Sequence, residues 1–196
     1  MHIGIDIDEV LCETLDFALH FSGGKIGGKP LSRKQVSDYY LPNILWYEDI
    51  SPEIAVSFFV NAQNSPRALQ ELQPVQWALE KLTTRKAEWH LLYAITARGE
   101  PVREATETRL AKYFPDIFDK IIFCNHYWKE YPTYSKEEIA KQEEIRLFVE
   151  DNPKYAIALE SLGIKVFLLE KPRNQSFISS DHPRIIKVSG RNEIKI

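Results

Sequence analysis

The stretch MHIGIDIDEVL, residues 1–11, decides the fold that we expect for the whole chain. Isoleucine alternates here with Gly4, Asp6 and Asp8, so the apolar side chains share one strand face and the two carboxylates share the other. Two acids about 7 Å apart along a buried strand repel each other unless a cation binds there or one carboxyl keeps a proton. In phosphoryl transfer one carboxylate can attack phosphorus while the other protonates the leaving oxygen. The alternative is a strand end with solvated acids.

The composition is that of an ordinary globular protein, with 44% apolar and 27% charged residues among 196. This length suits one domain with a large core, or a core with a modest insertion. A formal net charge of -3 provides no basic field, so we expect no nucleic-acid polymer as a partner. Neither a long apolar run nor a signal peptide is present, which predicts a cytoplasmic protein without a membrane span.

Residues 12–85 differ in character from the rest of the chain. Helical spacing over residues 12–21 leads into GGKIGGKP, residues 23–30, which nearly spells a phosphate-binding P-loop. Pro30 replaces the metal-binding hydroxyl and the segment follows a helix, so we expect a flexible loop that acts as a hinge. Residues 31–85 read as short helical pieces divided by prolines. This pattern predicts a second, helical module over residues 31–85.

Aromatic residues are concentrated in this module, at Tyr39, Tyr40, Trp46, Tyr47, Phe58 and Phe59. They can form the core of the module, or they can form a lid that offers flat faces to a base or another ring. For the second case we expect Phe17, Tyr40 and Trp46 to contact substrate.

Beyond Pro74, helices and strands alternate. Apolar runs predict strands over 89–95, 120–124, 145–149, 165–169 and 184–188, with helices over 75–86, 101–114, 153–162 and from Ser135 onward, where Glu138 has capping-box spacing. Strands separated by helices predict an α/β fold with a parallel sheet covered on both faces.

Three of the predicted strands end in polar side chains: Asp6 with Asp8, Thr96, and Glu150 with Asp151. Sites in open parallel sheets form beyond the carboxyl ends of the strands, so we expect one active site to contain all of these residues. Clustered carboxylates repel one another and a phosphate alike, which calls for a hard divalent cation before substrate can approach.

The same residues resemble the four motifs of the haloacid dehalogenase superfamily of phosphatases, in the same order. Asp6-Ile7-Asp8-Glu9-Val10 is similar to the first motif, and Thr96, Lys136 and Glu150-Asp151 are similar to the second, third and fourth. Glu9 departs from the glycine that is common in many phosphatase relatives. The segments IGIDIDEVL, FPDIFDKIIFCNH, EDNPKYA and KPRN also resemble bacterial relatives of the 5′(3′)-deoxyribonucleotidases.

The resemblance implies a Rossmann-like parallel sheet with the Asp6 strand between the Thr96 and Glu150 strands. Residues 1–14 and 86–196 would form the phosphatase core, and residues 15–85 a cap inserted after the first strand. Asp6 would be the nucleophile, and Asp8 first the general acid and then the base. Mg²⁺ would be held by the side chains of Asp6 and Asp151 and by the main-chain carbonyl of Asp8, with Glu150 nearby.

The resemblance further implies that Thr96, the amide of Ala97 and Lys136 bind the phosphate oxygens. Arg98 follows them and either contacts substrate or forms an ion pair. The expected function is therefore Mg²⁺-dependent hydrolysis of a phosphomonoester, with a nucleoside or deoxynucleoside monophosphate as the main hypothesis. A sugar phosphate or another small metabolite is the alternative substrate, and a non-enzymatic binding or regulatory module is the alternative class.

Overall fold

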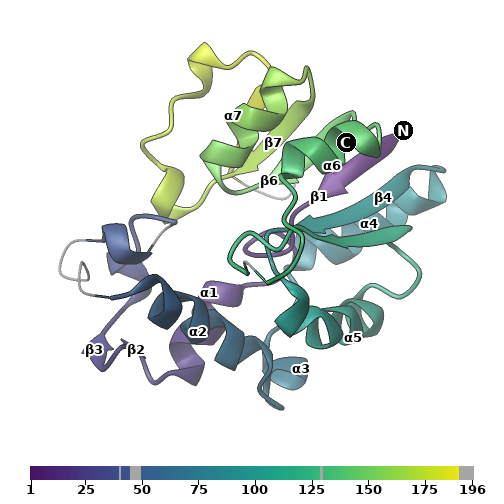
Figure 1. The fold of residues 1–196 in the computed structure, drawn as a ribbon. Coiled ribbons are helices and arrows are strands. Elements are labelled where there is room, and N and C mark those ends of the chain that lie inside the picture. The colour runs from purple at the N-terminus through teal and green to yellow at the C-terminus, as the bar shows by residue number, and fades with distance from the viewer. Residues whose placement is uncertain (40, 45–49, 129, 190–196) are drawn as a thin grey trace.

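The computed structural model describes residues 1–39, 41–44, 50–128 and 130–189. Its centre is a six-stranded parallel sheet in the order β5-β4-β1-β6-β7-β8 (Figure 1). The strands are β1 (His2–Ile5), β4 (Leu91–Thr96), β5 (Lys120–Phe123), β6 (Leu147–Glu150), β7 (Lys165–Leu169) and β8 (Ile185–Val188). Strand β1 pairs with β4 on one side and β6 on the other, which confirms the predicted α/β fold and the predicted place of the Asp6 strand.

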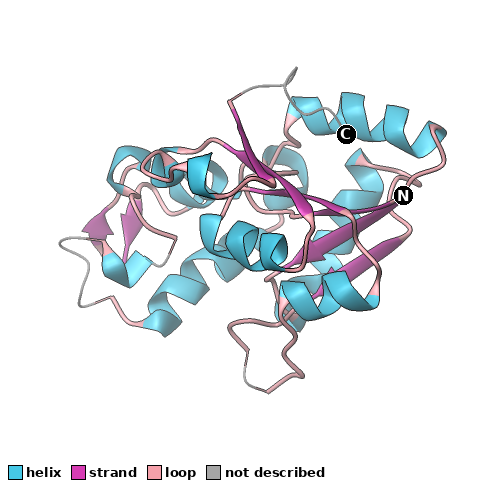
Figure 2. Cartoon of the chain, turned by 90° about the horizontal axis from the view of Figure 1, so that it is seen from above, coloured by secondary structure: helices cyan, strands magenta, loops and turns pink. Residues whose placement is uncertain are grey.

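Side chains that alternate along the strands divide the core between the two sheet faces. Leu92 and Ala94 belong to a cluster with apolar residues of α4 (Gln76–Ala87) and α5 (Arg103–Tyr113). Tyr93 and Ile95 belong to a second cluster with residues of α6 (Lys136–Gln142) and α7 (Pro153–Ser161). Figure 2 shows helices on both sides of the strands. The sheet is therefore covered on both faces, as the alternating pattern predicts.

The observed elements deviate slightly from their predicted bounds. Strand β4 begins at Leu91 because Trp89 has a left-handed backbone (φ 62°) and its side chain is 91% exposed. The predicted helix over 101–114 is a 3₁₀ turn, η3 (Glu100–Val102), followed by α5. Further 3₁₀ turns, η4 (Pro172–Asn174) and η5 (Ser179–Asp181), lie between β7 and β8. Among the described helices, none is both long and apolar enough to cross a bilayer.

The inserted segment leaves and returns to the sheet at one point, where Cys12 bridges to Pro74 and the N–H of Val75 donates to the carbonyl of Leu11 at 2.8 Å. It contains α1 (Thr14–Phe21), β2 (Lys25–Ile26), β3 (Lys29–Pro30), η1 (Arg33–Gln35), η2 (Leu41–Asn43), α2 (Pro52–Gln63) and α3 (Ala68–Glu71). Helix α4 follows the return point. The predicted cap over residues 15–85 includes α4, and this boundary stays a prediction.

Residues 23–30 do not form the flexible loop that the sequence predicts. Strands β2 and β3 pair antiparallel, and Gly27 (φ 55°) and Gly28 (φ 81°) form the two-residue turn between them. Two-residue hairpin turns need positive φ angles, which glycine adopts without steric cost. The glycines that favoured a loop therefore close a short hairpin, and its action as a hinge stays a prediction.

Candidate active site

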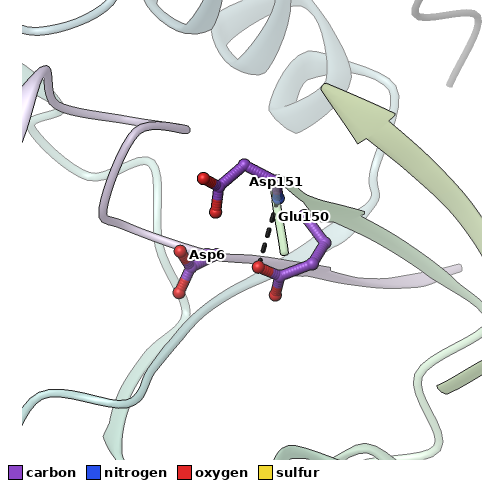
Figure 3. Close-up of side chains that lie close together, drawn as sticks. All are labelled: Asp6, Glu150 and Asp151. Carbon is purple, nitrogen blue, oxygen red and sulfur yellow. Dashed lines mark hydrogen bonds between the residues drawn. The ribbon is translucent and has the colours of Figure 1, made fainter. Parts of the chain in front are cut away.

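Three buried carboxylates lie together at the C-terminal edge of the sheet. Asp6 follows β1 directly, Glu150 ends β6, and Asp151 comes next in the chain. One oxygen from each lies within 4.8 Å of the others, and Figure 3 shows the three side chains grouped at this edge. Each residue is at most 5% exposed. Burial raises the pKa of all three carboxyl groups, and mutual repulsion adds to this effect.

Lys136 supplies positive charge to this cluster from the first residue of α6. The helix begins with the predicted capping box of Ser135 and Glu138, which fixes where Lys136 stands. Its side chain is 1% exposed, and its Nζ lies 2.7 Å from Asp6 Oδ1 and 2.7 Å from Glu150 Oε2. Burial opposes the charge of Lys136, but the two carboxylates raise its pKa well above the ordinary value. Lys136 therefore joins the ends of β1 and β6.

A second cation, Arg173, contacts Asp151. Its Nη2 lies 3.1 Å from Asp151 Oδ2, and its guanidinium stands 4.2 Å from the ring centroid of Tyr39. The main-chain carbonyl of Asp151 accepts hydrogen bonds from Tyr39 Oη at 2.5 Å and Asn174 Nδ2 at 2.7 Å. Our sequence-based site omitted these three partners. The KPRN segment was the available signal for Arg173 and Asn174, while Tyr39 was one aromatic residue among six.

The donor set of the acidic cluster fits Mg²⁺. When ionised, Asp6, Glu150 and Asp151 bring three negative charges against the two positive charges of Lys136 and Arg173, and all three offer carboxylate oxygens. Hard divalent cations prefer oxygen ligands, and a buried excess of negative charge requires compensation. The prediction that the main-chain carbonyl of Asp8 also binds the ion stays a prediction.

Asp8 forms a bidentate ion pair with Arg98. Arg98 Nε lies 3.0 Å from Asp8 Oδ2, and Arg98 Nη2 lies 2.7 Å from Asp8 Oδ1. Burial alone would raise the pKa of Asp8, but the charge and hydrogen bonds of Arg98 lower it overall. The guanidinium of Arg98, for which we had expected a substrate contact or an ion pair, is thus committed to Asp8.

Thr96 and Ala97 form the turn that follows β4. Thr96 is fully buried, and its hydroxyl accepts the main-chain N–H of Arg98 at 3.2 Å. Ala97 lines the cavity beside Asp6 and Asp8. Thr96 thus shapes the turn that presents Ala97 and Arg98, and phosphate binding by Thr96, Ala97 and Lys136 stays a prediction.

A cavity of about 180 Å³ opens above these residues. One wall carries Asp6, Asp8, Lys136, Glu150, Asp151 and Arg173. The inserted segment supplies a mainly apolar wall, formed by Leu41, Pro52, Ala55, Val56, Phe59 and Val60 together with Tyr39 and Gln63, and aromatic side chains of Tyr127, Trp128 and Tyr155 complete it. The cavity therefore has one charged wall, from the ends of the strands and their neighbours, and one mainly apolar wall from the insert.

Of the predicted substrate contacts from the insert, the structure describes Phe17, and this residue does not line the cavity. Phe17 is 6% exposed, packs against Phe21 with ring centroids 6.2 Å apart, and is absent from the cavity lining. Its apolar ring belongs to the core that α1 shares with the rest of the insert. Tyr40 and Trp46 lie outside the described residues.

The fold is similar to solved structures of haloacid dehalogenase-like hydrolases. A subfamily IA hydrolase of that superfamily from Geobacter sulfurreducens matches with a TM-score of 0.57 at 19% identity, covering 87% of each chain. A haloacid dehalogenase-like family hydrolase from Streptococcus pneumoniae matches with a TM-score of 0.59 at 12% identity, over 86% of this chain and 84% of that chain.

A third structure, described as a predicted phosphoglycolate phosphatase from Haemophilus somnus, matches with a TM-score of 0.57 at 14% identity, over 85% of this chain and 84% of that chain. No family model and no curated protein matches the sequence significantly. The structural likeness establishes that this chain has the haloacid dehalogenase-like fold.

Proposed function

We propose that the chain is a Mg²⁺-dependent phosphomonoesterase that works through an aspartyl-phosphate, an acyl phosphate formed on Asp6. The observation that carries the proposal is the shared cavity of Asp6 and Asp8, in which Asp6 stands among buried carboxylates and 2.7 Å from Lys136. A nucleophile and a proton-transfer group two residues apart suit the two halves of phosphomonoester hydrolysis.

In the first half, a carboxylate oxygen of Asp6 attacks phosphorus and the bond from phosphorus to the ester oxygen breaks. Asp8 gives a proton to that oxygen, so the product leaves as a neutral alcohol. In the second half, water attacks the phosphoryl group on Asp6, and Asp8 takes the proton of that water. Inorganic phosphate then leaves and Asp6 is restored as a carboxylate.

Cations set the electrostatics of this reaction. Asp6 and Asp151 would hold Mg²⁺ with Glu150 beside them, and the bound ion would neutralise negative charge on the phosphoryl group. Lys136 adds a fixed positive charge beside the nucleophile. Because Lys136 and the carboxylates are buried, their interactions with a phosphate are stronger than they would be in water.

The substrate class is a small phosphomonoester. The name of the similar structure from Haemophilus somnus, a predicted phosphoglycolate phosphatase, favours a small phosphorylated metabolite over the nucleotide of our main hypothesis. The apolar and aromatic lining of the insert side still suits a substrate with a flat or apolar part, so a nucleoside monophosphate stays a prediction.

Phosphate release from a panel of sugar phosphates, small phosphorylated acids and nucleoside monophosphates tests the proposal. We expect turnover that requires Mg²⁺, stops with a chelator and is lost in Asp6→Asn. Asp116→Asn is the matched control, because Asp116 is exposed and its left-handed backbone (φ 58°) is tolerated by asparagine. If the folded protein binds panel members without hydrolysing any of them, the proposal is wrong and a binding module is favoured.

A further inference from the structure

Arg98 and Asp8 both line the cavity, but their side chains differ sharply in exposure. The side chain of Arg98 is 3% exposed, whereas that of Asp8 is 35% exposed. The two Arg98 nitrogens that contact Asp8 reach different carboxylate oxygens, at 3.0 Å and 2.7 Å. A bidentate pair of this kind fixes both the position and the plane of a carboxylate. A buried group thus determines how an accessible one is oriented.

Arg98 is itself held by three elements. Its Nη1 donates to Thr106 Oγ1 of α5 at 2.8 Å, and its Nη2 donates to Thr14 Oγ1 of α1 at 3.3 Å. Its main-chain N–H donates to Thr96 Oγ1 at the end of β4. The main chain of Arg98 is therefore tied to the end of β4, and its guanidinium is anchored to a covering helix and to the first helix of the insert. The guanidinium cannot turn without breaking its bonds to Thr106 and Thr14.

The pair leaves Asp8 free to exchange protons on the cavity side. A carboxylate has about four lone-pair sites, and Arg98 uses one on each oxygen. The hydroxyl of Thr14 hydrogen-bonds the Asp8 carboxylate as well. The side chain of Asp8 is still 35% exposed, which leaves the remaining sites to the leaving alcohol and to water. Stability alone is a weak reason for such a pair, since apolar side chains of similar volume often stabilise a buried position equally well.

We propose that Arg98 is a positioning residue that orients Asp8 for proton transfer, an inference that rests on the proposed function. Arg98 keeps all its protons throughout, because guanidinium groups do not lose a proton in proteins. The proton passes from Asp8 to the ester oxygen as the Asp6–phosphorus bond forms and the phosphorus–oxygen ester bond breaks. In the second half it passes from water to Asp8 as the phosphoryl group leaves Asp6.

Leaving-group dependence tests this role. A nitrophenolate leaves without a proton, whereas an alkoxide needs one, so poor orientation of Asp8 should slow alkyl esters selectively. For Arg98→Gln we expect kcat to fall about 100-fold with an alkyl phosphate but less than about tenfold with p-nitrophenyl phosphate. We expect KM to change less than about threefold with both esters, because no ground-state contact is lost.

Two further variants separate orientation from charge. Arg98→Lys keeps the charge but cannot hold both carboxylate oxygens, so we expect it to show the same selective loss. Thr106→Val removes one hydrogen-bond partner of Arg98 and leaves the Arg98–Asp8 ion pair in place. For this variant we expect kcat to fall only a few-fold, again more with the alkyl phosphate than with p-nitrophenyl phosphate. If Arg98→Gln fails to fold by circular dichroism, Thr106→Val carries the test.

A double-mutant cycle completes the experiment. If Arg98 acts through Asp8, adding Arg98→Gln to Asp8→Asn should cause little further loss with the alkyl ester. Equal loss for both esters, a raised KM with unchanged kcat, or additive losses would each overturn the inference. Absence of hydrolysis by the native chain would instead overturn the proposed function, and this inference with it.

Discussion

Glu9 Oε2 lies 2.9 Å from Arg33 Nη2, and this ion pair joins the loop after β1 to the inserted segment. The Glu9 side chain is 1% exposed, and its Oε1 accepts the N–H of Leu15 in α1 at 2.8 Å. Glu9 has a left-handed backbone, with φ at 62°, a conformation that glycine adopts without steric cost. Here the side chain of Glu9 binds the insert to the loop that carries Asp6 and Asp8.

Loss of this ion pair should destabilise the protein. Arg33→Gln leaves the Glu9 carboxylate buried without its cation, and we expect the free energy of unfolding to fall by about 2–3 kcal/mol. Arg67→Gln is the control, because Arg67 and its partner Glu71 are 47% and 38% exposed, and water and salt screen such a pair so that it contributes little to stability. Urea denaturation measures both. Equal effects of the two variants would contradict the importance of Glu9.

Lys136 should be needed for turnover because it is the cation held closest to Asp6 in the described structure. Lys136→Met keeps the length of the side chain and removes its charge. We expect kcat to fall by about 10²–10³-fold, in the range seen when one group that stabilises the transition state is removed. Lys141→Met is the control, since Lys141 is exposed on the same helix. Near-native turnover in Lys136→Met would contradict this role and show that Mg²⁺ alone supplies the positive charge that the reaction needs.

Mg²⁺ should stabilise the protein more strongly as the pH rises. Without metal, burial raises the pKa of Asp151 to about 7 and that of Glu150 to about 8, so the folded state binds more protons than the unfolded chain. This contribution to stability is present below the ordinary carboxyl pKa of about 4 and is lost as the pH rises toward about 8. Mg²⁺ binds the ionised carboxylates, so its stabilising effect grows over the same window.

Thermal unfolding with MgCl₂ and with a chelator measures this effect. We expect a small shift of Tm at pH about 5.5 and a shift of several degrees at pH about 8. Asp151→Asn removes one of the predicted ligands and should abolish most of the shift. A shift that is independent of pH, or that survives in Asp151→Asn, would place the metal elsewhere.

The sheet and the acidic cluster could be predicted because both follow from local patterns. The strands can be identified from apolar residues that alternate with polar ones or follow one another without interruption. The strands that precede Asp6 and contain Glu150 are parallel neighbours in the sheet, so the acids at their carboxyl ends must lie close together. The capping box likewise fixed the start of α6 and therefore the place of Lys136. These features need only short-range sequence and the topology of a parallel sheet.

The partners of the charged groups could not be predicted in the same way. Arg98 and Asp8 are 90 residues apart in the chain, and Tyr39 and Asp151 are 112 apart, so their contacts depend on side-chain directions across separate elements. The hydrophobic periodicity of a sequence does not indicate the directions of these side chains. The ring of Phe17 was equally undetermined, since an apolar residue on α1 can face either the core or the cavity.

Identification of a phosphorylated residue tests the central claim most directly. The native protein is mixed with a substrate that it hydrolyses, quenched in acid within one turnover, digested and mapped by mass spectrometry. We predict a hydroxylamine-sensitive phosphate on Asp6 that is absent from Asp6→Asn. With p-nitrophenyl phosphate, whose leaving group needs no proton, this phosphate should accumulate in Asp8→Asn, where water is activated poorly. Efficient hydrolysis with no phosphate on Asp6, or with phosphate on another residue, would contradict the proposed mechanism.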